Sequence, residues 1–218
     1  MCRGLASLIG LLTFTLTAQA DFYFLIPHSD ANGTLQLVFN DSPKVNTNTQ
    51  VAEDLKLKTS QGVIPTKAGG AGWLAVPSSE SGTTYGVIEH GVQLRGQRDL
   101  AFVLFYVKHQ SELLNTPSSV PNSALELEAV RRGRGVSFIA KHQNQPLANA
   151  DVIVYVPGEK RWRAVRTDSL GSTTSFEPEG LYAARIYHKE QKAGEFQGRN
   201  FQEVRHYATL TVNAKNGK

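Results

Sequence analysis

Sulfur is almost missing from this sequence. The 218 residues include one cysteine and one methionine, and both stand at the start of the chain, as Cys2 and Met1. A mature protein that loses its first residues has no sulfur at all. Disulfides, a cysteine nucleophile, iron–sulfur clusters and thiolate or thioether metal sites are then excluded.

Charge is also sparse, and the short signatures of common enzyme classes are absent. Charged residues make up 19%, hydrophobic residues make up 40%, and the formal net charge is +4. This composition is typical of neither a disordered chain nor a membrane-embedded one. The sequence has no G-x-S-x-G, H-E-x-x-H, P-loop or G-x-G-x-x-G motif, so we expect a protein that is not an enzyme. A Ser–His–Asp site assembled from distant residues stays open.

The first 20 residues have the pattern of a cleaved signal peptide. Arg3 is the only charge before Asp21, an apolar run fills most of the space between them, and Ala18-Gln19-Ala20 offers small residues to a signal peptidase. The apolar run is too short to span a bilayer, which takes about 20 residues. We therefore expect cleavage after Ala20, a location in the periplasm or outside the cell, no transmembrane anchor after cleavage and no nucleic-acid partner.

Short alternating and apolar segments predict an all-β fold. Residues 101–107 are apolar on both faces, as in a central strand, and residues 151–156 alternate with valine on one face. Turn signals recur at about every 8–12 residues in the second half, which is typical of a β-sandwich. A stretch rich in proline and serine, 117–124, is the best linker in the chain.

The expected organisation is two β-sandwich-like domains behind the signal peptide. The first domain covers 21–116 and the second covers 125–214, with a tail at 215–218. Residues 21–121 carry a net charge of −2, whereas residues 122–218 carry +5.

The second half also resembles a known type of sandwich. Gln145-Pro146-Leu147-Ala148-Asn149-Ala150-Asp151-Val152, Thr167 to Gly171, Phe176 and Gly180-Leu181-Tyr182 are similar to the transthyretin-like or carboxypeptidase-regulatory-like β-sandwich, which is Ig-like in architecture. The resemblance implies a fold and says little about function, because this sandwich has many roles.

A second resemblance extends over the whole chain after the signal peptide. Asp21 to Pro27, Tyr85-Gly86-Val87, His188 and Arg205 to Thr211 are similar to a family of secreted bacterial proteins that share a domain of unknown function. Some members of that family are associated with nickel or cobalt uptake. The resemblance implies a non-enzymatic accessory protein whose partner is a membrane metal transporter or another component of the envelope.

His188 and His206 form the best candidate metal site. If 181–188 and 204–212 are the arms of one symmetric hairpin, the two imidazoles lie directly opposite and face inward. Glu190 and Glu203 are the nearby carboxylates, and His90 is a weaker candidate; His109 and His142 receive no role. Imidazole and carboxylate ligands suit nickel, cobalt, copper(II) or zinc. Two hydrogen-bonded, half-buried histidines without a metal are the alternative.

A different kind of site is predicted on the surface of the second half. Arg131, Arg132 and Arg134 lie in one turn, and Trp162 stands among basic residues. Such a surface can bind an envelope glycan, an anionic polymer or a protein partner. The alternatives are a solvated hairpin turn and a tryptophan that packs in the core or at its rim.

Overall fold

The structure is a computed structural model that describes residues 21–28, 34–44, 55–59, 62–70, 73–77, 82–95, 99–116 and 123–214. Its regular secondary structure in these ranges is β-strand throughout, which confirms the all-β prediction. The described residues contain no helix that is long and apolar enough to cross a membrane. The expected signal peptide, 1–20, and the tail, 215–218, lie outside the described residues.

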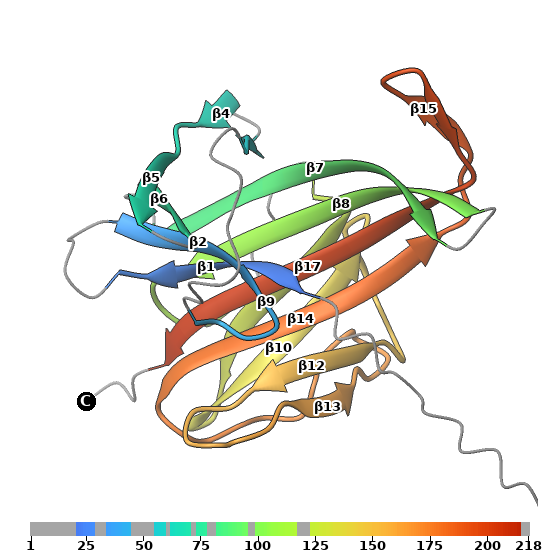
Figure 1. Ribbon diagram of the computed structural model, residues 1–218. Helices are drawn as coiled ribbons and strands as arrows, with labels where there is room; N and C mark the ends of the chain where they lie inside the picture. Colours follow the sequence, from blue (N-terminus) through green and yellow to red (C-terminus); the bar gives the residue numbers. More distant parts are fainter. Residues whose placement is uncertain are drawn as a thin grey trace, which may run out of the picture.

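An eight-stranded sheet runs through the centre of the molecule (Figure 1). Its strand order is β13-β12-β14-β17-β8-β7-β3-β4. The bounds of these strands, in chain order, are Leu57–Thr59 for β3, Gly62–Ile64 for β4, Thr83–Arg95 for β7, Asp99–Gln110 for β8, Asp151–Tyr155 for β12, Arg163–Arg166 for β13, Gly180–Glu190 for β14 and Glu203–Ala214 for β17.

A smaller sheet covers each face of the central sheet (Figure 1). On one face lie β1 (Phe22–Pro27), β2 (Thr34–Asn40), β6 (Trp73–Pro77) and β5 (Lys67–Gly70). On the other face lie β9 (Leu125–Arg132), β10 (Gly135–His142) and β11 (Gln145–Pro146). An apolar core fills each of the two interfaces, so the described residues form three layers. A third, smaller apolar cluster lies around Val92, Phe201 and Val204.

Alternation along the central strands decides which core each side chain enters. Tyr182, Ala184 and Ile186 of β14 pack against the β9–β10 layer, whereas Ala183 between them packs against the β1 layer. Strand β8 is covered on both faces, because Phe105 belongs to the core beneath β1 and Tyr106 to the core beneath β9. The prediction that 101–107 is a central strand is therefore confirmed.

The central sheet joins the two halves of the chain. β8 from the first half pairs in parallel with β17 from the second half, from Ala101 opposite Glu203 to Gln110 opposite Val212. Strands from both sides of the expected linker, 117–124, therefore belong to one sheet. Two separate domains and a transthyretin-like arrangement of the second half stay predictions.

Side-chain hydroxyls fasten β1 to the central sheet. Thr209 Oγ1 donates a hydrogen bond of 2.6 Å to the Tyr23 carbonyl, and Thr211 Oγ1 donates one to the Leu25 carbonyl. Both threonines are buried. These bonds satisfy polar atoms that would otherwise be costly at the centre of the protein.

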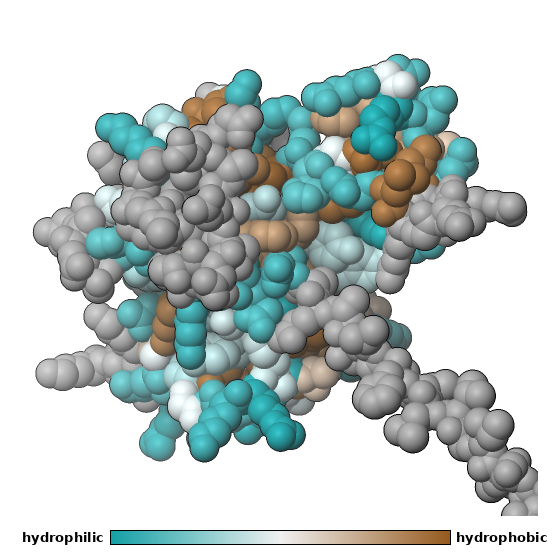
Figure 2. Space-filling model, viewed as in Figure 1, coloured by the Kyte–Doolittle hydropathy of each residue, from teal (hydrophilic) through white to brown (hydrophobic). Residues whose placement is uncertain are grey.

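A small hairpin extends beyond the end of β14 and β17. It consists of β15 (Gly194–Phe196) and β16 (Arg199–Phe201), which lie between the two arms of the predicted hairpin, 181–188 and 204–212. Phe196 and Phe201 stack on Phe102 of β8, with ring centroids 4.5 and 5.4 Å apart. Figure 2 shows brown, apolar atoms gathered beside this hairpin, at the upper right.

Candidate metal centre

Three inward-facing rows of side chains each reach a histidine at the same end of the core. On β10 the row is Val136, Phe138, Ala140 and His142; on β14 it is Tyr182, Ala184, Ile186 and His188; on β17 it is Val212, Leu210, Ala208 and His206. Glu190 follows His188 by two residues and continues the β14 row. A core that is apolar along most of its length therefore has a polar end made of imidazoles and one carboxylate.

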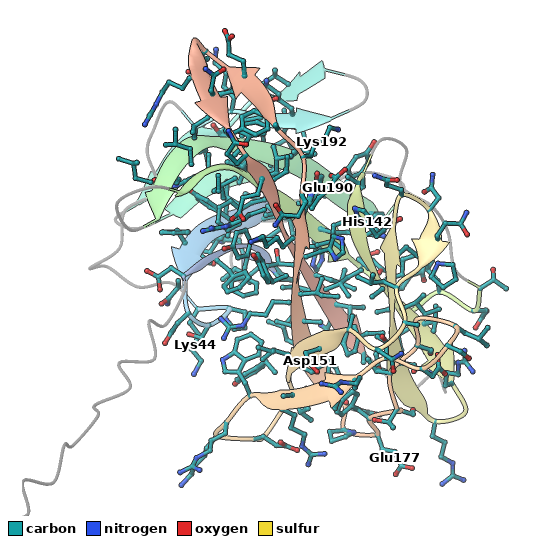
Figure 3. All side chains as sticks on the ribbon, turned by 90° about the vertical axis from the view of Figure 1, so that its right-hand side faces the viewer. Lys44, His142, Asp151, Glu177, Glu190 and Lys192 are labelled. Atoms are coloured by element: carbon teal, nitrogen blue, oxygen red, sulfur yellow. The ribbon has the colours of Figure 1, made fainter. Side chains whose placement is uncertain are left out.

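His142, Glu190 and His206 approach closely enough to share one metal ion. Each offers one ligand atom, and these three atoms all lie within 4.8 Å of one another. Figure 3 shows the labelled residues His142 and Glu190 close together. The three residues come from β10, β14 and β17, so the arrangement exists only once the two layers have packed.

His206 is the most buried member and is held at both ring nitrogens. Its side chain is 3% exposed. Its Nε2 lies 3.2 Å from Glu190 Oε2, and its Nδ1 lies 3.0 Å from the Tyr106 hydroxyl. An ionised carboxylate can only accept, so Nε2 carries the proton and Tyr106 donates to Nδ1 in the neutral ring.

Burial favours the neutral form of two imidazoles in the cluster, those of His206 and His188. It lowers the pKa of His206 below the usual value, although the nearby Glu190 acts in the opposite direction. Burial also lowers the pKa of His188, helped by the neighbouring His142 and opposed by Glu190. Neutral imidazole is the form that binds a metal, so these side chains need not lose a proton to become ligands near neutral pH.

One nitrogen of His142 has its hydrogen-bonding capacity unused. Nε2 is shielded from solvent and has no hydrogen-bond partner among the described residues. A buried polar atom without a partner costs about 1–3 kcal/mol. A metal ion at this point would satisfy that atom.

The prediction that His188 and His206 lie opposite one another is confirmed. Of the predicted ligands, the structure brings His206 and Glu190 into the three-residue cluster. His188 and His206 lie directly opposite in the β14–β17 register, with ring centroids 6.3 Å apart. The His188 ring lies closer to His142, at 4.2 Å between centroids. His142 was not among the predicted ligands, although the alternation from Val136 to Ala140 places it on the inward face.

Two of the predicted ligands, Glu203 and His90, are not brought into the cluster. Glu203 is three residues from His206, so it points to the opposite face of β17, where it pairs with Arg205 and with Lys189 at 2.5 Å. The hydrogen bond from Lys189, with Arg205 adding to it, lowers the pKa of Glu203. His90 lies on β7, and its ring packs against Phe105 with centroids 5.5 Å apart, on the β1 side of the sheet.

The residues of the predicted surface site are not brought together in one patch. Arg132 at the end of β9 and Arg134 in the β9–β10 turn are exposed, and this turn lies at the opposite end of β10 from His142. Trp162 is half-buried, stacks on Phe24 and belongs to the packing beneath β1. Binding of an envelope component through Arg131, Arg132 and Arg134 stays a prediction, and Trp162 has a packing role.

Comparisons with protein-family models, with curated proteins and with solved structures find no match to this chain. The resemblance to secreted proteins associated with metal uptake therefore stays a prediction.

Proposed function

We propose that this protein binds a divalent transition-metal ion through His142, Glu190 and His206. The observation that carries the proposal is the convergence of three ligand atoms from three strands within 4.8 Å of one another. The unpartnered, buried Nε2 of His142 supports it independently.

The chemistry of the donors narrows the choice of metal. Two imidazoles and one carboxylate suit zinc, nickel, cobalt and copper(II), whereas calcium and magnesium prefer sites made only of oxygen. Copper(I) prefers sulfur, which the described residues do not contain. Among the remaining ions the usual order of affinity rises from cobalt to nickel to copper(II).

A second layer of contacts supports the proposed ligands. Metal-binding histidines usually hold their other ring nitrogen in a hydrogen bond, which fixes the ring. His206 has this arrangement, because Tyr106 holds Nδ1 while Nε2 faces Glu190. Metal binding at Nε2 would move the proton to Nδ1, and the Tyr106 hydroxyl, which can also accept, would then receive it.

The biological role that we propose is that of an exported binding protein, an accessory that presents the metal to a membrane transporter. This role rests on the metal site together with the resemblance to secreted proteins associated with nickel or cobalt uptake. The sequence offers no catalytic signature that would favour a reaction at the site.

Titration calorimetry of the full chain with nickel, cobalt, copper(II) and zinc tests the site. Wild type should bind one ion, and the double variant His142→Ala/His206→Ala should lose binding. The matched control is His90→Ala, which also removes an imidazole but on the other face of the sheet, and it should bind as wild type does. Equal heats from wild type and the double variant would overturn the proposal.

A further inference from the structure

A cavity of about 460 Å³ lies along one edge of β14, where the pairing of that strand with β12 ends. β14 pairs with β17 as far as Glu190. The shorter β12 lies on its other side (Figure 1) and pairs with it only as far as Ile186. Among the described residues, 187–190 therefore have no strand partner on the β12 side. The volume is in the usual range for ligand sites, about 300–1,000 Å³.

The cavity borders the backbone of β14 and not just one of its faces. Four consecutive residues of the strand, 185–188, line it. Neighbouring side chains in a strand point to opposite faces, so a cavity on one face would be lined by every second residue. The unbroken run indicates that the open space lies beside the strand, where the backbone of a further strand would pair.

The opposite wall of the cavity is a segment with a fixed shape, 147–151. Thr167, which is buried, holds this segment through its side chain. Its Oγ1 donates to the Leu147 carbonyl at 2.6 Å and accepts from the Ala150 N–H at 2.9 Å. Within the described part of the chain, no backbone hydrogen bond joins this wall to 187–190. The two walls are thus held apart, and the edge of β14 stays open between them.

The lining on the β1 side of the cavity is apolar and carries no net formal charge. Phe22 belongs to β1, and Ile153 of β12 points to the same face of the central sheet. Asp151 and Arg185 also line the cavity, and both are engaged. Asp151 pairs with Arg166 at 3.1 Å, and the Arg185 guanidinium lies 4.5 Å from the centre of the Phe22 ring. Such a lining favours an uncharged, apolar side chain over an ion.

We propose that the cavity accepts an uncharged, extended peptide segment of a partner protein, which adds to the edge of β14 as a short strand. A strand edge offers a row of N–H and C=O groups that is complementary to another extended backbone, and such additions are a recurring mode of peptide recognition. The edge at 187–190 has a length of about 13 Å. An aliphatic side chain of the peptide would lie against Phe22 and Ile153. Strand addition here does not depend on the metal site.

The probe for the test is a pentapeptide that alternates threonine and leucine and is acetylated and amidated at its ends. It is titrated into the isotope-labelled full chain, without added metal, while NMR follows the backbone amides. The signals of 187–190 should move, and at least one of these amides should exchange with solvent at least about tenfold more slowly when the peptide is in excess. If these amides do not change with about 1 mM peptide, the proposal is overturned.

N-methylated peptides separate strand pairing from simple filling of the cavity. Methyl groups on the leucine amides block one edge of the peptide, and methyl groups on the threonine amides block the other. One of these two peptides should bind at least about tenfold more weakly than the parent, because it loses two or more hydrogen bonds. Equal affinities of all three peptides would show that the backbone of β14 is not the partner, which would overturn the proposal.

Two variants of the chain test where the peptide binds. Ala148→Trp adds a large side chain at an exposed position in the wall opposite β14, and it should weaken binding of the parent peptide at least about tenfold. The matched control is Thr174→Trp, which adds the same side chain at an exposed position that does not line the cavity, and it should bind as wild type does. Unchanged binding to Ala148→Trp would place the peptide outside the cavity and would also overturn the proposal.

Discussion

His188 lies directly opposite His206 across the β14–β17 pair, but the two residues have different surroundings. His206 is buried and hydrogen-bonded at both ring nitrogens, whereas His188 is half-buried and borders the cavity along β14. The pair thus places one imidazole within the core and one at its boundary. The buried ring, held at both nitrogens, is the one suited to hold a metal in a fixed position.

This difference predicts unequal effects of removing the two rings. His206→Ala should weaken nickel binding about 100-fold or more, since it removes a ligand and the anchor of Tyr106 and Glu190. His188→Ala should weaken it less than about tenfold, because the three remaining ligand atoms stay in place. Competition against a coloured chelator measures both affinities. Equal losses would contradict the assignment of His142, Glu190 and His206 as the ligands.

The Tyr106 hydroxyl should tune the affinity without touching the metal. It is the partner of His206 Nδ1, and loss of such a partner typically costs about 10–100-fold in metal affinity. We expect the metal affinity of Tyr106→Phe to be about 10–100-fold lower than that of wild type, with one ion still bound per chain. The same competition assay checks this value, and calorimetry checks the stoichiometry. An affinity equal to that of wild type would show that the hydroxyl does not orient the ring.

Much of the metal centre follows from the period of two in β-strands, and part of it does not. The opposition of His188 and His206 was predicted from the symmetry of one hairpin, which is a local feature. The same alternation places Glu203, an odd number of residues from His206, on the opposite face of β17, and it places His142 on the inward face of β10. Which strand of the second layer meets His206, however, is set by packing between layers, and the sequence carries no local signal of it.

The parallel pairing of β8 and β17 could not be predicted either. Their partners, such as Tyr106 and Ala208, are about 100 residues apart in the chain, and no turn or connection links them locally. What the sequence did show was that 101–107 is apolar on both faces. A strand with this pattern needs a neighbouring strand on each side and a packed layer on each face, but the pattern does not identify those partners.

A buried ion network between β8 and the β9–β10 layer should make Lys108 important for stability. Its Nζ lies 2.8 Å from Glu126 Oε1 and 3.9 Å from Glu128 Oε1, and all three side chains are at most 6% exposed. Lys108→Met removes the positive charge that offsets these buried carboxylates, so we expect a loss of about 3–5 kcal/mol in the free energy of unfolding. Urea denaturation measures it.

Two further variants distinguish burial from pairing as the cause. Lys108→Met/Glu126→Met should be more stable than Lys108→Met, because it also removes a carboxylate that is costly to bury. Arg163→Met breaks an exposed pair with Glu159 and should cost less than about 1 kcal/mol. If Lys108→Met lowers the free energy of unfolding as little as Arg163→Met does, the buried network stabilises the protein no more than an exposed ion pair.

The buried His109 should make the folded protein less stable in acid. Burial lowers its pKa from 6.5 to about 4. Thr211 Oγ1 lies 2.9 Å from His109 Nδ1 and uses its only proton on the Leu25 carbonyl, so it must accept from Nδ1. The neutral ring is therefore the form that the core accommodates.

The direction of the pH effect follows from these two pKa values. Between pH 6.5 and 4 the unfolded chain binds a proton at His109 that the folded chain does not bind, so stability falls as the pH falls. From pH 7 to pH 4 this residue should lower the free energy of unfolding by about 3 kcal/mol. Below pH 4 both states are protonated, and this contribution to the slope ends. Above pH 6.5 both are neutral, and His109 contributes no slope.

His109→Asn isolates this contribution from that of the other histidines. The asparagine amide can donate to Thr211 from nearly the position of Nδ1, and it does not titrate. The free energies of unfolding of wild type and variant, measured in urea from pH 7 to pH 4, should therefore diverge by about 3 kcal/mol, with the variant losing less. Parallel curves over this range would show that His109 is protonated as readily in the folded protein as in the unfolded chain.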